Sequence, residues 1–169
     1  KHLVWADKDR KLWLHELTTR TTTLIANSAR SGFGELVWSP DSQWLAYTDP
    51  ASNLVQQIHL YRLADGSKNT VTSDRVESYS PAWSPDGKSV AYFSDAGGAY
   101  KLVIASQDGI TPARTIALPE PSFYYTPAWS PDGSKILYTD AHLRLWVTDV
   151  VAGRSTRVDT DPFMLPERS

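Results

Sequence analysis

The sequence of 169 residues contains no cysteine, which excludes both a disulfide framework and a thiol nucleophile. No stretch approaches the roughly eighteen consecutive apolar residues of a membrane-spanning helix. The first residues, KHLVWADKDRK, lack the apolar core and cleavage pattern of a signal peptide, although a signal removed earlier stays compatible with the sequence. The lack of cysteine leaves the compartment open, and we favour a periplasmic or secreted location over a cytoplasmic one.

An excess of basic charge is also missing. The chain carries 17 Lys and Arg against 19 Asp and Glu, a net charge of −2, and its basic residues are scattered rather than gathered in a stripe. This pattern argues against a nucleic-acid partner, because phosphate backbones are bound by clustered positive charge. With 41% hydrophobic and 21% charged residues, the composition is typical of a folded globular domain.

What the sequence does contain is a repeat. The heptapeptide PAWSPDG occurs at residues 81–87 and 127–133, and a variant, LVWSPDS, occurs at residues 36–42. In each copy a Trp is followed three residues later by Asp and nine residues later by Tyr: Trp38, Asp41 and Tyr47; Trp83, Asp86 and Tyr92; Trp129, Asp132 and Tyr138. The steps between the Trp residues are 45 and 46 residues. This period predicts a repeat array whose unit is one small sheet.

Each repeat reads as four strands. In the Ser-Pro-Asp sequence, proline presets φ for a turn and aspartate can cap it, so a short first strand turns into a β-rich run such as WLAYT or KILYT. A third run, such as QIHLYRL, and a more polar fourth run, such as NTVTS, follow after further turns. Four antiparallel strands per repeat predict a β-propeller blade, and therefore an all-β fold.

We expect a single, partial propeller over residues 1–169, with about four blades. Blade 1 covers about residues 1–30, blade 2 about 35–74, blade 3 about 80–119 and blade 4 about 126–163, as the repeat period sets them. The segment LVWAD near the start aligns with LAYTD of the next repeat, so Trp5 takes the place of Tyr47. Blade 1 therefore begins at its second strand and lacks the innermost one.

The other end of the chain fits this interpretation. The last strand of a repeat precedes the next Trp by 12 or 13 residues, and the same count from Val158 passes Ser169. Blades left open at both ends expose apolar faces that are rarely tolerated on a soluble monomer. We therefore expect the propeller to be completed by the rest of a longer parent chain, by a second copy in a homo-oligomer, or by closure into a ring of four.

The segments AWSPDGKSVAYFSD and AWSPDGSKILYTD resemble the WD-like propeller repeat of the translocation protein TolB, of tricorn protease and of prolyl-oligopeptidase relatives. The stretches LVWADKDRKLWLHEL, ALPEPSFYYTPAWSPDG and HLRLWVTDVVAGRSTRVDTDPF are similar to propellers of bacterial tricorn-like serine peptidases, and this likeness covers nearly the whole chain. The resemblance implies propellers that gate peptides toward a separate catalytic part. It also implies that the catalytic residues of that family lie outside the present chain.

The residues themselves show no catalytic constellation. No Gly-x-Ser-x-Gly elbow exists. There are four histidines, of which His2 lies at the start of the chain, and the other three fall on different blades or on a loop: His15, His59 and His142. Three serines precede proline in the repeated turns, which indicates a structural role: Ser39, Ser84 and Ser130. The acid pairs Asp7/Asp9 and Asp159/Asp161 lack a full calcium loop. We expect no catalytic residue, no metal and no cofactor.

A ligand is expected where the repeats differ. The recurring Trp and Tyr residues favour packing between blades over an aromatic ligand cage. The connections into the inner strands, SARSGFGEL, SDRVESYSP and LPEPSFYYTP, are expected at one face near the central channel. They supply a predicted contact surface for a peptide or protein: Phe33, Glu35, Arg75, Glu77, Tyr79, Glu120, Phe123, Tyr124 and Tyr125. The alternative is that these residues only cover the ends of the blades.

Two functions stay open at this point. The first is a non-catalytic propeller segment that controls access of substrates in a tricorn-like peptidase. The second is a TolB-like scaffold that binds a protein and has no peptidase attached. A protease domain downstream in the full-length gene would favour the first, because fold alone does not decide function.

Overall fold

The computed structural model describes residues 1–73 and 75–158, and every regular element in these residues is a strand. The strands of the first half are β1 (His2–Ala6), β2 (Lys11–Glu16), β3 (Thr21–Asn27), β4 (Gly34–Trp38), β5 (Trp44–Pro50), β6 (Gln56–Arg62) and β7 (Lys68–Thr70). Those of the second half are β8 (Ser78–Trp83), β9 (Ser89–Ser94), β10 (Lys101–Ser106), β11 (Arg114–Ala117), β12 (Tyr124–Trp129), β13 (Lys135–Asp140), β14 (Leu145–Asp149) and β15 (Arg154–Arg157). No helix suited to crossing a membrane occurs in these residues.

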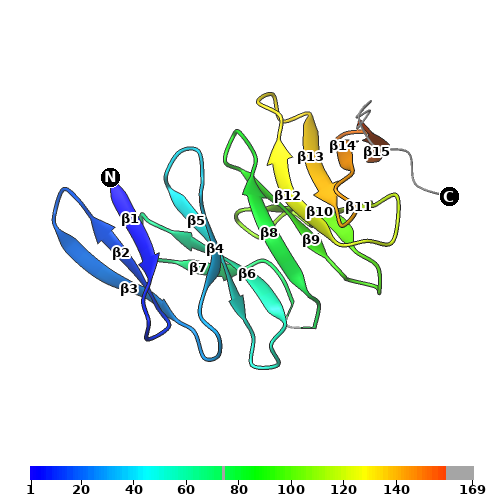
Figure 1. Ribbon diagram of the computed structural model, residues 1–169. Coiled ribbons are helices and arrows are strands. Elements are labelled where there is room, and N and C mark those ends of the chain that lie inside the picture. Colours follow the sequence, from blue (N-terminus) through cyan, green and yellow to red (C-terminus); the bar gives the residue numbers. More distant parts are fainter. Residues whose placement is uncertain (74, 159–169) are drawn as a thin grey trace.

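The strands form four antiparallel meanders that lie side by side in a row (Figure 1). The sheets β4–β7, β8–β11 and β12–β15 have four strands each, whereas the sheet β1–β3 has three. The predicted all-β propeller, with a first blade that lacks its innermost strand, is confirmed. The first and last sheets lie at opposite ends of the row (Figure 1). The end of predicted blade 4, with Asp159 and Asp161, falls outside the described residues.

The core consists of three layers, each between two neighbouring sheets. Alternate residues of a strand face opposite neighbours: in β5, Leu45 and Tyr47 pack toward the first sheet, and Ala46 packs toward the third. The layer between the third and fourth sheets contains the largest fully buried side chains, including Phe93, Tyr124 and Tyr138. The buried apolar contacts that stabilise the fold therefore lie between consecutive sheets, as expected for stacked repeats.

The repeated Ser-Pro-Asp turn is held by its own side chains. In the fourth sheet, the Ser130 hydroxyl donates to the Asp132 carboxylate at 2.6 Å, and this carboxylate accepts the backbone N–H of Ser134 at 3.0 Å. The turns at Ser39 and Ser84 have the same bonds. Because these hydrogen bonds stabilise the ionised carboxylate, they lower the pKa of Asp132 to about 2.

Tryptophan side chains connect successive sheets. The indole Nε1 of Trp129 donates to the carbonyl oxygen of Ala82 at 3.1 Å, and that of Trp83 donates to the carbonyl of Val37 at the same distance. Both acceptors lie on the innermost strand of the preceding sheet. Trp38 has no matching hydrogen bond among the described residues, because the first sheet lacks that strand. The two equivalent links therefore exist only where an inner strand precedes the tryptophan.

Candidate functional site

The innermost strands β4, β8 and β12 each contain a bulge at the same repeat position. Register shifts occur between Gly34 and Val37, between Tyr79 and Ala82, and between Tyr125 and Ala128. Within the bulges, three residues other than glycine have a positive φ: 38° at Glu35, 55° at Ser80 and 51° at Thr126. Such conformations persist only when surrounding structure holds them, and bulges redirect side chains from the regular pleat.

The bulges of the second and third sheets are joined by a carboxylate. Glu35 Oε2 accepts the backbone N–H of Ser80 at 2.9 Å, and Glu35 Oε1 accepts the Ser80 hydroxyl at 2.9 Å. Both carboxylate oxygens are thus engaged by one residue of the next sheet. The two residues are 45 positions apart, one repeat, so the contact connects the inner strands β4 and β8.

Next to this contact lies a chain of aromatic rings. Tyr79 and Tyr100 meet edge to face with centroids 5.6 Å apart, and Tyr100 and Phe123 lie 5.2 Å apart. The Tyr79 hydroxyl accepts the backbone N–H of Tyr124 at 3.4 Å, which connects β8 to β12. Phe123 is 54% exposed and its neighbour Tyr125 is 43% exposed. Exposed aromatic rings on a fixed support are typical of residues that bind a partner.

A hollow of about 400 Å³ opens over these rings. Its lining residues, which we call the aromatic hollow, are Gly98, Ala99, Tyr100, Pro121, Ser122, Phe123, Ala141 and His142. Burial, followed by the negative charges of Asp95 and Glu77, raises the pKa of Tyr100, so its phenol stays protonated at neutral pH. The hollow therefore offers apolar surface with a hydroxyl, a serine and an imidazole at its edge.

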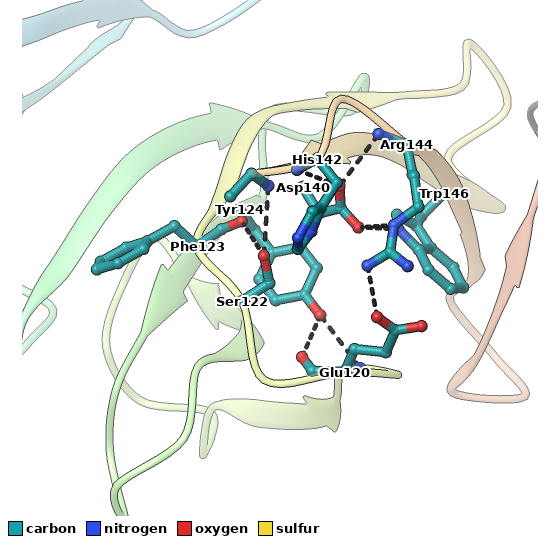
Figure 2. Close-up of polar contacts among 9 residues, drawn as sticks. Glu120, Ser122, Phe123, Tyr124, Asp140, His142, Arg144 and Trp146 are labelled. Atoms are coloured by element: carbon teal, nitrogen blue, oxygen red, sulfur yellow. Dashed lines mark hydrogen bonds and ion pairs between the residues drawn. The ribbon is translucent and has the colours of Figure 1, made fainter. Parts of the chain in front are cut away.

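Hydrogen bonds hold the wall of the aromatic hollow in place (Figure 2). The Tyr124 hydroxyl donates to the carbonyl of Glu120, and the Ser122 hydroxyl accepts the backbone N–H of Ala141 at 3.3 Å. The Phe123 ring points away from this polar network (Figure 2). The loop before β12 is thus anchored on both sides of Phe123, which leaves this ring presented to solvent on a rigid base.

Asp140 is the centre of the network below the loop. Its carboxylate is fully buried and accepts hydrogen bonds from Trp146 Nε1 at 3.0 Å and Arg144 Nε at 2.7 Å. Arg144 also pairs with Glu120 through its second guanidinium nitrogen. Burial raises the pKa of Asp140, but the hydrogen bonds from Trp146 and Arg144 outweigh it and lower the pKa to about 2. The carboxylate therefore acts as a fixed structural anion.

The structure brings together part of the predicted contact surface. Tyr79 and Phe123 lie near one another, since Tyr79 contacts β12 and Phe123 continues the chain of rings through Tyr100. Tyr125 lies close enough to interact electrostatically with Tyr79 and Tyr100. Glu35 lies beside them through Ser80, and Glu120 supports the loop through Arg144. Glu77 lies close enough to Tyr100 for its charge to raise the pKa of that phenol, but its carboxylate accepts the backbone N–H of Gln56 at 3.1 Å. The remaining two lie elsewhere: Phe33 packs edge to face on Tyr47, and Arg75 is exposed in its own turn.

One predicted contact residue does not belong to the surface. Tyr124 is fully buried between the third and fourth sheets, against Phe93 and Tyr138. The expectation failed because the run FYY in the loop and strand alternates its direction once β12 begins at Tyr124. Tyr124 therefore supports the surface from below while its neighbours Phe123 and Tyr125 stay exposed.

Sequence reasoning missed the other aromatic and polar residues of the aromatic hollow, which are Tyr100, Ser122 and His142. Tyr100 ends the loop DAGGAY before β10, and its aromatic character was the available signal. Ser122 lies in the loop before β12, and His142 lies in the loop between β13 and β14. The other histidines have local partners: His15 Nδ1 lies 2.9 Å from Thr22 Oγ1, and His59 Nδ1 lies 2.9 Å from Thr70 Oγ1.

Acid clusters suited to a metal are not found among residues 1–73 and 75–158. The Asp7 carboxylate of the predicted pair Asp7/Asp9 is engaged by Trp13 Nε1 at 2.7 Å and by the backbone N–H groups of Asp9 and Lys11. These bonds, with that from Trp13 the strongest, lower the pKa of Asp7. Asp7 with Trp13 thus closes the hairpin between β1 and β2 in the same way as Asp140 with Trp146 closes the one between β13 and β14.

A family model described as the TolB β-propeller domain matches residues 2–141. The chain belongs to this family. Its sequence is 32% identical over 94 residues to a tricorn-like protease C-terminal subunit of Sulfurisphaera tokodaii, which covers 56% of the chain and 11% of that protein. It is 34% identical over 89 residues to tricorn protease homolog 1 of Streptomyces coelicolor, covering 53% of the chain and 8% of that protein. The chain thus spans about a tenth of the length of these curated relatives.

Solved structures of TolB and tricorn proteins share the fold of this family member. A TolB from Agrobacterium tumefaciens superposes with a TM-score of 0.70 at 19% identity, over 92% of the chain and 59% of that structure. TolB from Acinetobacter baumannii gives 0.71 at 17% identity, over 95% and 41%. Tricorn protease gives 0.63 at 14% identity, over 95% and 25%. The resemblance to TolB and tricorn-type repeats is confirmed.

Proposed function

We propose that this chain is a non-catalytic propeller segment that contacts peptide or protein substrates of a tricorn-like peptidase. The identity to two tricorn relatives supports the peptidase context. The observation that carries the proposal is the exposed Phe123 ring, which packs at a tilt against Tyr100 and lies on a loop anchored by hydrogen bonds. The loop that bears it follows the third blade and is one of the connections whose sequences differ between repeats, and such loops commonly carry binding residues.

A binding experiment tests this role. We expect fluorescein-labelled peptides from a random hexapeptide library to bind the chain, and Phe123→Ala to weaken the binding about fivefold to tenfold, as for the loss of an interface aromatic. Ile110→Ala is the matched control, because Ile110 is 82% exposed but lies in the turn between β10 and β11. Equal binding by wild type and Phe123→Ala would contradict the proposed contact surface.

The segment is further proposed to assemble with additional blades or a second copy. A hollow of about 630 Å³ borders β1 and Trp38, lined by Lys1, His2, Leu3, Leu17, Trp38, Ser42 and Gln43. Leu3 and Leu17 are 53% and 45% exposed there. An inner strand paired with β1 would cover these side chains and supply the carbonyl that Trp83 and Trp129 find in their own preceding sheets.

Light scattering coupled to size exclusion, over a hundredfold concentration range, tests self-assembly. A discrete dimer or higher closed oligomer supports completion by a second copy. A monomer of 18.8 kDa at every concentration contradicts self-completion and favours further blades of a longer parent. In either case, we propose that catalysis belongs to another part of such a parent.

A TolB-like scaffold that binds a protein is the second candidate. The family model that matches residues 2–141, the TolB β-propeller domain, supports it. The two candidates differ in their ligands. A scaffold would bind a folded protein but not short peptides, whereas a substrate-contacting segment would bind both unfolded chains and peptides.

A further inference from the structure

The contact between Glu35 and Ser80 is a carboxylate-binding site whose ligand is supplied by the protein itself. Ser80 offers two donors on one side, its backbone N–H and its hydroxyl, and both reach the Glu35 carboxylate at 2.9 Å. The bulge and the φ of 55° at Ser80 remove this N–H from the regular ladder and turn it toward the second sheet. Hydrogen bonds from such oriented backbone groups to a charged oxygen are stronger than those between neutral groups.

Thr126 repeats this arrangement one blade later. It occupies the equivalent position of β12, inside the bulge between Tyr125 and Ala128, and its φ of 51° matches that of Ser80. It carries a hydroxyl, as Ser80 does. The two donors that Ser80 presents to a carboxylate are therefore present again at Thr126.

The carboxylate, however, has no counterpart at Thr126. Glu35 lies one repeat before Ser80. The position one repeat before Thr126 is occupied by Ser80 itself, which has no carboxylate and whose hydroxyl already donates to Glu35. Within residues 1–73 and 75–158, no side chain hydrogen-bonds to the backbone N–H or the hydroxyl of Thr126, and the residue is exposed. No carboxylate of the described residues therefore occupies the position at Thr126 that Glu35 occupies at Ser80, and the exposed Thr126 is accessible from solvent.

The presence of threonine at this position supports a binding role for its hydroxyl. A β-branched residue at positive φ is unfavourable by roughly 1–2 kcal/mol, and glycine would relieve this strain. Thr126 keeps its hydroxyl in this conformation, beside two exposed aromatic rings, Tyr125 and Phe123. Because β12 is the innermost strand of its sheet, its free edge is accessible to an extended chain.

We propose that the backbone N–H and hydroxyl of Thr126 bind a carboxylate of a peptide ligand, as those of Ser80 bind Glu35. The peptide nature of the ligand rests on the proposed function, whereas the carboxylate preference rests on the repeat itself. The carboxylate comes from the C-terminus of the peptide or from a Glu or Asp side chain. The adjacent rings of Phe123 and Tyr125 contact the apolar side chains next to it.

Titration with acetate tests the site without reference to any peptide. In amide NMR spectra of the chain, we expect saturable acetate-dependent shifts of the Thr126 amide signal, with the Ser80 signal unmoved because Glu35 fills that site. Thr126→Val, which keeps the branched shape and removes the hydroxyl, is expected to weaken acetate binding at least threefold, and Thr126→Ser is expected to retain it. A Thr126 signal that does not move with acetate, or equal affinities of the two variants, overturns the inference.

A second arm uses peptides and a self-ligand variant. N-acetyl-Ala-Phe-Ala with a free C-terminus is expected to bind at least fivefold more tightly than its C-terminal amide. An amidated peptide with an internal Glu that regains the loss assigns the preference to a side-chain carboxylate. Ser80→Glu introduces a glutamate one repeat before Thr126, as Glu35 lies one repeat before Ser80. This variant is expected to abolish the preference for the free carboxylate by filling the Thr126 site, whereas Ser80→Thr is expected to keep that preference.

The two arms separate the failure of each proposal. Equal binding of free acid and amide, unchanged in Ser80→Glu, overturns the carboxylate site and leaves peptide binding by Phe123 intact. Absence of binding by both peptides, together with a saturable acetate shift at Thr126, contradicts the proposed function and supports the site. The NMR spectrum of Ser80→Glu verifies that this variant is folded before its peptide data are used.

Discussion

The indole Nε1 of Trp83 donates a hydrogen bond to the carbonyl oxygen of Val37, across the boundary between the second and third sheets. Trp129 and Ala82 repeat the bond one sheet later, also at 3.1 Å. The acceptor lies on the bulged inner strand in both cases, so each of these strands has both a bulge and a carbonyl that accepts the tryptophan N–H of the next sheet. Successive sheets are thus connected by a specific polar contact within an apolar layer.

This contact predicts a difference between equivalent tryptophans. Trp83→Phe removes the indole N–H and leaves the Val37 carbonyl without its donor, so we expect it to lower the free energy of unfolding by about 1–2 kcal/mol. Trp38→Phe is the control, because Trp38 has no equivalent acceptor in the described residues. Urea unfolding of the two variants measures the difference. Equal losses in both would show that the hydrogen bond makes no net contribution.

The fourth position of the repeated turn predicts opposite effects for two substitutions. Ser42 has a φ of 57°, where the later repeats have Gly87 and Gly133 at 70° and 72°. Ser42→Gly is expected to stabilise the chain by about 0.5 kcal/mol, since relief of the left-handed conformation exceeds the entropy cost of glycine. Gly87→Ala is expected to destabilise it by about 1 kcal/mol. A Cβ at Gly87 would meet only Asp41, at 3.7 Å or more, so crowding does not account for the loss. Thermal unfolding measures both changes.

The ion pair below the aromatic hollow predicts a large loss on truncation. Arg144→Gln leaves the fully buried Asp140 carboxylate without its cation, so we expect it to lower the free energy of unfolding by about 2–4 kcal/mol. Arg62→Gln is the matched control, because its pair with Asp65 is half exposed and is expected to contribute less than about 0.5 kcal/mol. A similar small loss in both variants, measured by urea unfolding, would contradict the structural role of the Asp140 network.

The turn aspartates predict a loss of stability in acid. The pKa of Asp132 falls from 3.8 to about 2 on folding, because Ser130 and Ser134 donate to its carboxylate. A lowered folded pKa contributes stability that is complete above the unfolded value and is lost as the pH falls through the folded value. The free energy of unfolding is therefore expected to fall between about pH 4 and pH 2. Asp132→Asn should flatten this decline in acid urea titrations; a slope equal to that of the wild type would exclude the contribution.

The repeat could be predicted from local sequence because its chemistry is local. Proline and aspartate fix the turn after each Trp within a few residues, as the bond between Ser130 and Asp132 shows. The alignment of Trp5 with Tyr47 predicted the missing strand, which the three-stranded first sheet confirms. The surface was less accessible to prediction. Tyr124 is buried where contact was expected, and Tyr100 reaches Phe123 from a loop of another sheet.

The sequence by itself determined the strand order within a blade, the repeat of about 45 residues and the family, because turn residues and alternating apolar runs act over short distances. Only the tertiary structure decided which bulge residue is paired and which is open. Glu35 reaches Ser80 across 45 residues of chain, and nothing local to either residue specifies that contact. The packing of neighbouring sheets brings the two inner strands together, and that packing also leaves Thr126 exposed and without a carboxylate partner among the described residues.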